Sequence, residues 1–73
     1  MYCIRNKVSR LFFVGDALCW TSVFEFARFY EHSYEALNHL YKILPNIDKN
    51  TCEVLLIDYK PIDIGYQFEL VKV

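Results

Sequence analysis

The 73 residues of this chain are 55% hydrophobic and 18% aromatic, with eight basic and nine acidic side chains and a net charge of −1. This length holds one domain with a small core, so we expect residues 1–73 to form a single unit. The near-neutral charge excludes both a strongly acidic nucleic-acid mimic and a broadly cationic nucleic-acid-binding chain. So many large apolar side chains exceed what one small core hides, which favours a homodimer or an aromatic surface that contacts a partner.

The cysteines and the apolar runs bear on where the protein resides. Cys3, Cys19 and Cys52 are an odd number of cysteines without CxxC spacing. Together with the lack of a signal peptide, this predicts a reducing, cytoplasmic setting in which all three thiols are buried. No apolar run approaches the roughly 18 to 20 residues that cross a bilayer, so we expect a soluble protein without a membrane partner.

Three short strands are expected in the N-terminal part of the chain. Residues 2–7 alternate, with Tyr2 and Ile4 on one side and Cys3, Arg5 and Lys7 on the other, as in a strand with one solvent-exposed face. Residues 11–14 form a second strand, paired with the first as a hairpin. A turn at Gly15 lets residues 18–20 return as a short third strand.

The following segment permits two interpretations. One helix could span residues 23–44, because aromatic and aliphatic side chains recur there with the helical period and no Gly or Pro interrupts them. Such a helix would carry aromatic side chains on more than one face, and Ser33 would lose its capping ability inside it. We favour a helical turn over residues 22–26, an extended piece over 28–30 and a helix that begins at Ser33.

Residues 33–44 predict one amphipathic helix. Its apolar side chains recur at helical spacing and form one broad stripe: Tyr34, Ala36, Leu37, Leu40, Tyr41, Ile43 and Leu44. We expect this stripe to pack on a sheet. Ser33 can cap the first turn by accepting from backbone N–H groups, and Pro45 ends the helix because it disfavours helical geometry in the preceding residue.

The C-terminal part predicts two further strands. Residues 46–51 are polar and form a loop, whereas residues 52–59 are apolar on both faces and indicate a strand that is central or covered on both sides. Residues 60–65 form a connection, and residues 66–73 alternate as the last strand. The expected fold is α+β: a small antiparallel sheet packed on one face by the helix over residues 33–44, in ββ(β)αββ order.

Residues with catalytic or metal-binding chemistry lack a suitable arrangement in the sequence. His32 and His39 are seven residues apart, whereas two imidazoles on one metal ion favour i, i+4 spacing. The cysteines fall in apolar, strand-like segments, where burial keeps a thiol protonated. We therefore expect no catalytic residue, no metal site, no cofactor and no enzymatic activity.

Two kinds of binding surface are candidates. The first is a protein-interaction surface made of residue types that dominate protein interfaces. Its candidate residues are Trp20, Arg28, Tyr30, Tyr59 and Tyr66. An exposed edge strand, such as the first hairpin or residues 66–73, is a further site where a partner or a second copy could pair. The alternative is a nucleic-acid surface on the basic N-terminal hairpin, formed by Arg5, Lys7, Arg10 and Phe12.

The pattern W-T-x(5)-A-x-[FY]-[FY]-x-x-S-Y-E-A-L-x-x-L, which begins at Trp20 and ends at Leu40, resembles very small accessory proteins of phages and other mobile elements. The resemblance covers about half of the chain and concerns a strand-strand-helix-strand arrangement. It implies an accessory factor that acts by binding, and some such proteins inhibit host defence nucleases as anti-CRISPR or other anti-defence proteins. The expected function is therefore a protein-interaction module that sterically blocks a host protein, without turnover, as a monomer or a homodimer.

Overall fold

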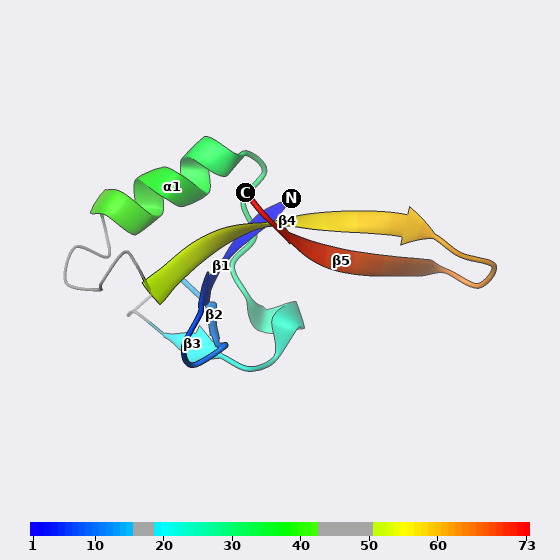
Figure 1. Ribbon diagram of the computed structural model, residues 1–73, viewed down its shortest axis with the longest axis horizontal. Coiled ribbons are helices and arrows are strands. Elements are labelled where there is room, and N and C mark those ends of the chain that lie inside the picture. The colour runs from blue at the N-terminus through cyan, green and yellow to red at the C-terminus, as the bar shows by residue number, and fades with distance from the viewer. Residues whose placement is uncertain (16–18, 43–50) are drawn as a thin grey trace.

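The computed structural model describes residues 1–15, 19–42 and 51–73 of the chain. Its elements are β1 (Tyr2–Asn6), β2 (Phe12–Phe13), β3 (Trp20–Thr21), the 3₁₀ helix η2 (Phe24–Phe26), α1 (Ser33–Lys42), β4 (Cys52–Pro61) and β5 (Tyr66–Lys72). The strands form one antiparallel sheet in the order β3-β2-β1-β4-β5, and α1 packs on one face of it (Figure 1). The predicted α+β class and order of elements are confirmed.

The predicted break between two helical segments is also confirmed. After η2 the chain is extended, and the backbones of Tyr2 and Tyr30 pair: each N–H donates to the other residue's carbonyl, at 2.7 and 2.8 Å. The helix α1 then begins at Ser33. Residues 43–45, which include the predicted helix end and Pro45, lie outside the described residues, as does most of the predicted loop.

The first turn of α1 is capped by His32 and Glu35 and not by Ser33 as predicted. The Glu35 carboxylate accepts a hydrogen bond from the His32 backbone N–H at 3.0 Å. The Glu35 N–H in turn donates to the His32 carbonyl at 3.2 Å. This is the Glu half of a capping box, with His32 at the capping position. Ser33, predicted as the cap, is the first residue of the helix itself.

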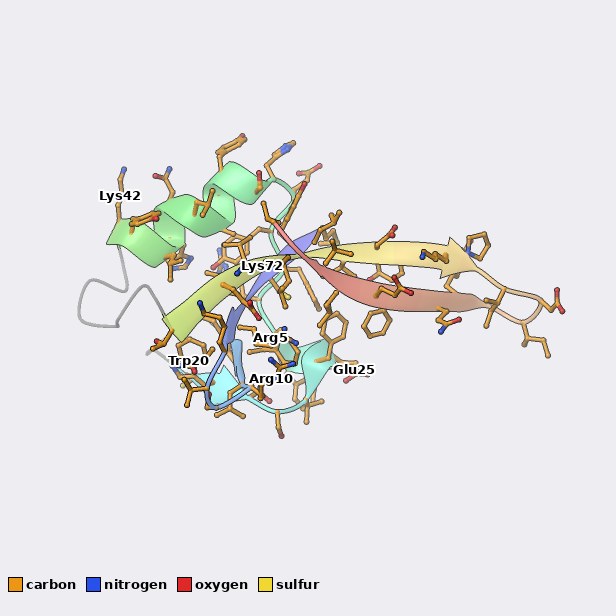
Figure 2. All side chains as sticks on the ribbon, in the orientation of Figure 1. Arg5, Arg10, Trp20, Glu25, Lys42 and Lys72 are labelled. Atoms are coloured by element: carbon orange, nitrogen blue, oxygen red, sulfur yellow. The ribbon has the colours of Figure 1, made fainter. Side chains whose placement is uncertain are left out.

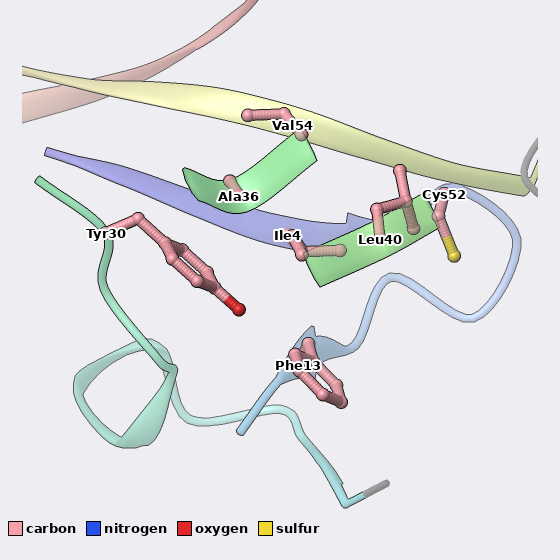
Figure 3. Close-up of a cluster of buried hydrophobic side chains, with 7 residues drawn as sticks. All are labelled: Ile4, Phe13, Tyr30, Ala36, Leu40, Cys52 and Val54. Carbon is pink, nitrogen blue, oxygen red and sulfur yellow. The ribbon is translucent and has the colours of Figure 1, made fainter. Parts of the chain in front are cut away.

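Both faces of the sheet are covered. On the helix side, Figure 3 shows one buried cluster made of Ile4, Phe13, Tyr30, Ala36, Leu40, Cys52 and Val54. On the other face, the segment around η2 covers a second cluster made of Cys3, Phe12, Ala27, Leu55 and Ile57. The covered, central position predicted for residues 52–59 is confirmed for residues 52–57, whereas Tyr59 is 52% exposed. The exposed face predicted for β1 is wrong: Cys3 is 0% exposed, because the segment around η2 packs over this face of the sheet.

The face of α1 that packs on the sheet is narrower than predicted. Ala36 and Leu40, one helical turn apart, are buried, whereas Tyr34, Leu37 and Tyr41 are exposed. The small Ala36 side chain lets the helix approach the sheet closely. The outer half of the predicted stripe therefore remains largely exposed to solvent.

The cysteines differ in exposure, contrary to the prediction that all three are buried. Cys3 and Cys52 are buried, whereas Cys19 is exposed. All three lie in the described part of the chain and are not joined by disulfides. In the same part of the chain, no helix has the length and apolar character required to span a membrane.

The β4–β5 hairpin extends beyond the rest of the sheet (Figure 1). Pairing between β1 and β4 reaches only Tyr2 opposite Leu56, whereas pairing between β4 and β5 continues to Pro61 opposite Tyr66. Residues 58–69 therefore form a two-stranded ribbon that projects from the domain, and we call them the arm.

Candidate protein-interaction surface

One face of the arm is apolar and exposed. Tyr59 lies opposite Phe68, and Pro61 lies opposite Tyr66, so these four side chains share one side of the ribbon. Tyr66 is 75% exposed, Tyr59 52% and Phe68 42%, and Pro61 is exposed as well. We call these four residues the aromatic face.

The opposite face of the arm is polar. It carries Asp58 opposite Glu69 and Lys60 opposite Gln67. The Lys60 ammonium lies 3.3 Å from the Glu69 carboxylate, and both side chains are more than half exposed. The arm is therefore an amphipathic ribbon whose apolar side stays largely exposed.

The aromatic face is continuous with the domain core. The ring of Phe68 stacks on Phe24 of η2, with centroids 4.6 Å apart and an interplanar angle of 17°. Phe24 also contacts Phe12 and Phe29 edge to face, at centroid distances of 5.5 and 5.3 Å. An unbroken series of ring contacts thus leads from the buried Phe12 to the exposed arm.

The tip of the arm carries two exposed apolar side chains, one on each side of the exposed Asp63. Ile64 is 91% exposed and Ile62 is 50% exposed. The Ile62 N–H donates to the Gly65 carbonyl at 3.2 Å, which closes the turn, and Gly65 has a φ of 89°. Exposed apolar side chains grouped at one end of a small protein are typical of an interaction site.

Of the five residues predicted for a protein interface, two lie on the aromatic face. They are Tyr59 and Tyr66. Phe68 and Pro61 were not among the predicted residues, although the alternation of Tyr66 and Phe68 indicated that they share a side. Trp20 is half-buried against the core, with its ring 5.5 Å from that of Phe13. Figure 2 shows Trp20 far from the tip of the arm.

Tyr30 is part of the core, so its prediction as a surface residue is wrong. It is 5% exposed, and its hydroxyl lies 2.6 Å from His39 Nδ1. Burial raises the pKa of the Tyr30 hydroxyl above its ordinary value. Its backbone pairing with Tyr2 explains the position, because that pairing turns the ring inward under α1.

Arg28 is exposed but lies away from the arm. Its guanidinium carbon is 5.6 Å from the centroid of the Tyr30 ring, and its side chain passes over Gly15. A cavity of about 370 Å³ lies here, lined by Arg28, Tyr30, Glu35, Asn38, His39 and Lys42. Basic and acidic groups both line this cavity, so its charge selects no single class of ligand.

The residues of the alternative nucleic-acid surface are not arranged for base stacking. Phe12 is 9% exposed and belongs to the second core cluster, so its ring cannot stack on a nucleobase. Arg5 donates from Nε and Nη2 to Glu53 Oε1, at 2.9 and 2.6 Å. Lys7 and Arg10 remain exposed at the β1–β2 turn. The predicted stacking role of Phe12 is wrong, and Arg5 already has a carboxylate partner.

The described residues carry little reactive chemistry. No three of their His, Cys, Asp or Glu side chains are grouped so that they could hold a metal ion. Burial raises the pKa of the Cys3 thiol to about 11, which keeps it protonated near neutral pH. Comparisons with models of protein families, with curated proteins and with solved structures gave no match.

Proposed function

We propose that this protein is a non-enzymatic protein-interaction module that binds a partner protein through the aromatic face of the arm. The observation that carries the proposal is the set of exposed rings of Tyr59, Tyr66 and Phe68 on a ribbon that projects from the domain. Tyrosine buries a large area with few rotatable bonds to immobilise, and aromatic residues are enriched in interfaces for this reason.

The chemistry of the arm favours a partner with an apolar groove or pocket. Its aromatic face has no charged group, whereas the polar face opposite carries the Lys60–Glu69 ion pair. A partner that covers the aromatic face would remove apolar surface from water without desolvating a charge. The polar face would remain in solvent.

The biological role that we propose is steric inhibition. The resemblance to small accessory proteins of phages and mobile elements supports a cytoplasmic factor that occupies a surface of a host protein, such as a defence protein, and performs no reaction. A projecting arm suits this role because it can reach into a site on a larger protein. The nucleic-acid alternative has less support, since Phe12 is buried and Arg5 is ion-paired.

A tagged pull-down from a bacterial lysate, with and without nuclease, tests the proposal. We expect the wild-type protein to retain a host protein after nuclease treatment, and the Tyr59→Ser/Tyr66→Ser variant to lose it. Circular dichroism must show that the variant is folded, which we expect because both tyrosines are more than half exposed. Recovery that disappears with nuclease, or equal recovery by the folded variant, would overturn the proposal.

A further inference from the structure

The direction of the backbone hydrogen bonds shows which groups β5 leaves unpaired. The Ile57 N–H donates to the Met1 carbonyl at 2.8 Å, so odd-numbered residues of β4 direct their backbone groups toward β1. Even-numbered residues of β4 therefore face β5, as the bond from the Val73 N–H to the Val54 carbonyl also shows. Their partners in β5 are the odd-numbered residues. The backbone groups that point outward belong to Tyr66, Phe68, Leu70 and Lys72.

This outer edge of β5 lacks the bulge and the proline that often block strand addition, and its charged side chains are Glu69 and Lys72. The pairing with β4 runs without a bulge over seven consecutive residue pairs, and β5 contains no proline. No strand of the described chain pairs with this edge. The outer edge of β4 in the arm differs, because Pro61 has no N–H to donate there. An unprotected, regular edge strand is a template for another strand.

We propose that two copies of this chain pair through their β5 edges, antiparallel about a two-fold axis, with Phe68 opposite Phe68 of the second copy. A two-fold axis perpendicular to the sheet keeps the aromatic faces of both copies on the same side. The outward-pointing backbone groups then meet in three pairs, Phe68 with Phe68 and Tyr66 with Leu70 twice, each exchanging two hydrogen bonds.

The side chains favour this register over those shifted toward the C-terminal end of β5. A shift that centres the axis on Glu69 places two Glu69 carboxylates directly opposite each other, which is destabilising. A shift that centres the axis on Leu70 places the apolar Phe68 side chain opposite the charged Lys72 of the second copy, which is a poorer match than Phe68 opposite Phe68. In the proposed register Gln67 lies opposite Glu69, so the amide can donate to the carboxylate, and all the opposed side chains on the aromatic face are apolar.

Pairing in this register extends the aromatic surface across both copies. Tyr59 lies beside Phe68 within one chain, so the rings would follow one another across the joined sheet as Tyr59, Phe68, Phe68 and Tyr59. The inference goes beyond the proposed function, because it concerns the strand edge and a second copy of the chain. It is also tested with the purified chain alone, so its failure would leave binding of a partner by the arm unaffected.

Sedimentation velocity over a concentration series measures the association, with one chain having a mass of 8.7 kDa. Two substitutions of the exposed Gln67 test the register. We expect Gln67→Glu, which faces Glu69 of the second copy, to raise the dimer dissociation constant roughly threefold to tenfold, and Gln67→Lys to lower it by a similar factor. Within one chain Gln67 lies opposite Lys60. Gln67→Glu should therefore stabilise the fold and Gln67→Lys should destabilise it, which is the reverse of their effects on the dimer.

Cross-linking gives a second readout of the register. In a Cys19→Ser background, oxidised Gln67→Cys/Glu69→Cys should form a disulfide-linked dimer, because the two positions would form a closely spaced non-hydrogen-bonded pair. Glu69→Cys alone should not cross-link. A protein that stays monomeric at every soluble concentration, Gln67 variants that shift the dissociation constant in the same direction, or efficient cross-linking through Glu69→Cys alone would overturn the proposal.

Discussion

The ring of Phe24 stacks on the ring of Phe68, with centroids 4.6 Å apart and planes 17° from parallel. Phe24 belongs to η2 in the body of the domain, and Phe68 belongs to the arm. The stack is therefore a side-chain contact that joins the arm to the body of the domain. Because Phe68 contacts Phe24 and is also 42% exposed, one aromatic residue takes part both in the packing of the arm and in its exposed surface.

A double-mutant cycle on Phe24 and Phe68 should show this coupling. We expect Phe24→Ala to be the more destabilising single change, because Phe24 also contacts Phe12 and Phe29. The double variant should lose about 0.5 to 1.5 kcal/mol less than the sum of the single changes. Urea unfolding followed by circular dichroism measures each value. Additive effects would show that the stack does not stabilise the arm.

Substitutions of the two glycines should differ in cost. Both have positive φ, 116° at Gly15 and 89° at Gly65, so Ala is strained at either position, by about 1 kcal/mol. At Gly15 the added methyl group would also lie 2.9 Å from Arg28 Cδ, whereas at Gly65 no atom lies within 4 Å. We expect Gly15→Ala to lower the melting temperature more than Gly65→Ala. When Arg28→Ala is added, the difference in melting temperature between the two glycine variants should become smaller. A difference that persists without the Arg28 side chain would exclude this contact as its cause.

The two ion pairs should contribute unequally to stability. Arg5 and Glu53 have side chains that are 17% and 9% exposed, whereas Lys60 and Glu69 are 55% and 57% exposed. Arg5→Gln leaves a largely buried carboxylate without its partner and should cost about 1 to 3 kcal/mol. Lys60→Gln should change the free energy of unfolding by less than about 0.5 kcal/mol. Equal effects in chemical denaturation would contradict a structural role for Arg5.

Stability should fall in alkaline solution because of Cys3. The unfolded chain releases the thiol proton near the ordinary pKa of 9.0, whereas burial holds the pKa in the folded protein at about 11. The contribution of the Cys3 thiol to the free energy of unfolding is therefore fully present below pH 9. This contribution decreases as the pH rises toward 11, by up to about 1.4 kcal/mol per pH unit. Cys3→Ala should unfold with a shallower pH dependence over this window. An unchanged slope in the variant would contradict this assignment.

Local patterns predicted most of the secondary structure. The alternation of residues 66–73, the apolar residues 52–59 and the helical spacing that begins near Ser33 indicated β5, β4 and α1, although His32 and Glu35 form the cap that was predicted for Ser33. Local patterns do not report what lies over each face of an element. The exposure of Tyr34 and Tyr41 and the burial of Cys3 depend on the close approach of Ala36 and on the packing of the segment around η2 over the sheet, which are properties of the complete fold.

The candidate surface was predictable only in part. Tyr59 and Tyr66 follow from residue type, because large aromatic side chains dominate interfaces. Phe68 and Pro61 require the β4–β5 register, and the projecting arm requires that β1 stop pairing at Tyr2. Tyr30 has the same residue type but pairs with Tyr2 and is buried, which only the three-dimensional arrangement reveals.

The affinity of the host protein recovered after nuclease treatment, measured by isothermal titration calorimetry, tests most directly whether the aromatic face binds a partner. Wild-type protein is compared with Tyr59→Ser/Tyr66→Ser and with a matched variant on the helix, Tyr34→Ser/Tyr41→Ser, whose tyrosines are 64% and 55% exposed. We predict that the arm variant binds at least about 30-fold more weakly, as expected for loss of a hot spot, and that the helix variant binds like the wild type. Unchanged affinity of the arm variant, or loss of binding by the helix variant alone, would contradict the proposed role of the arm.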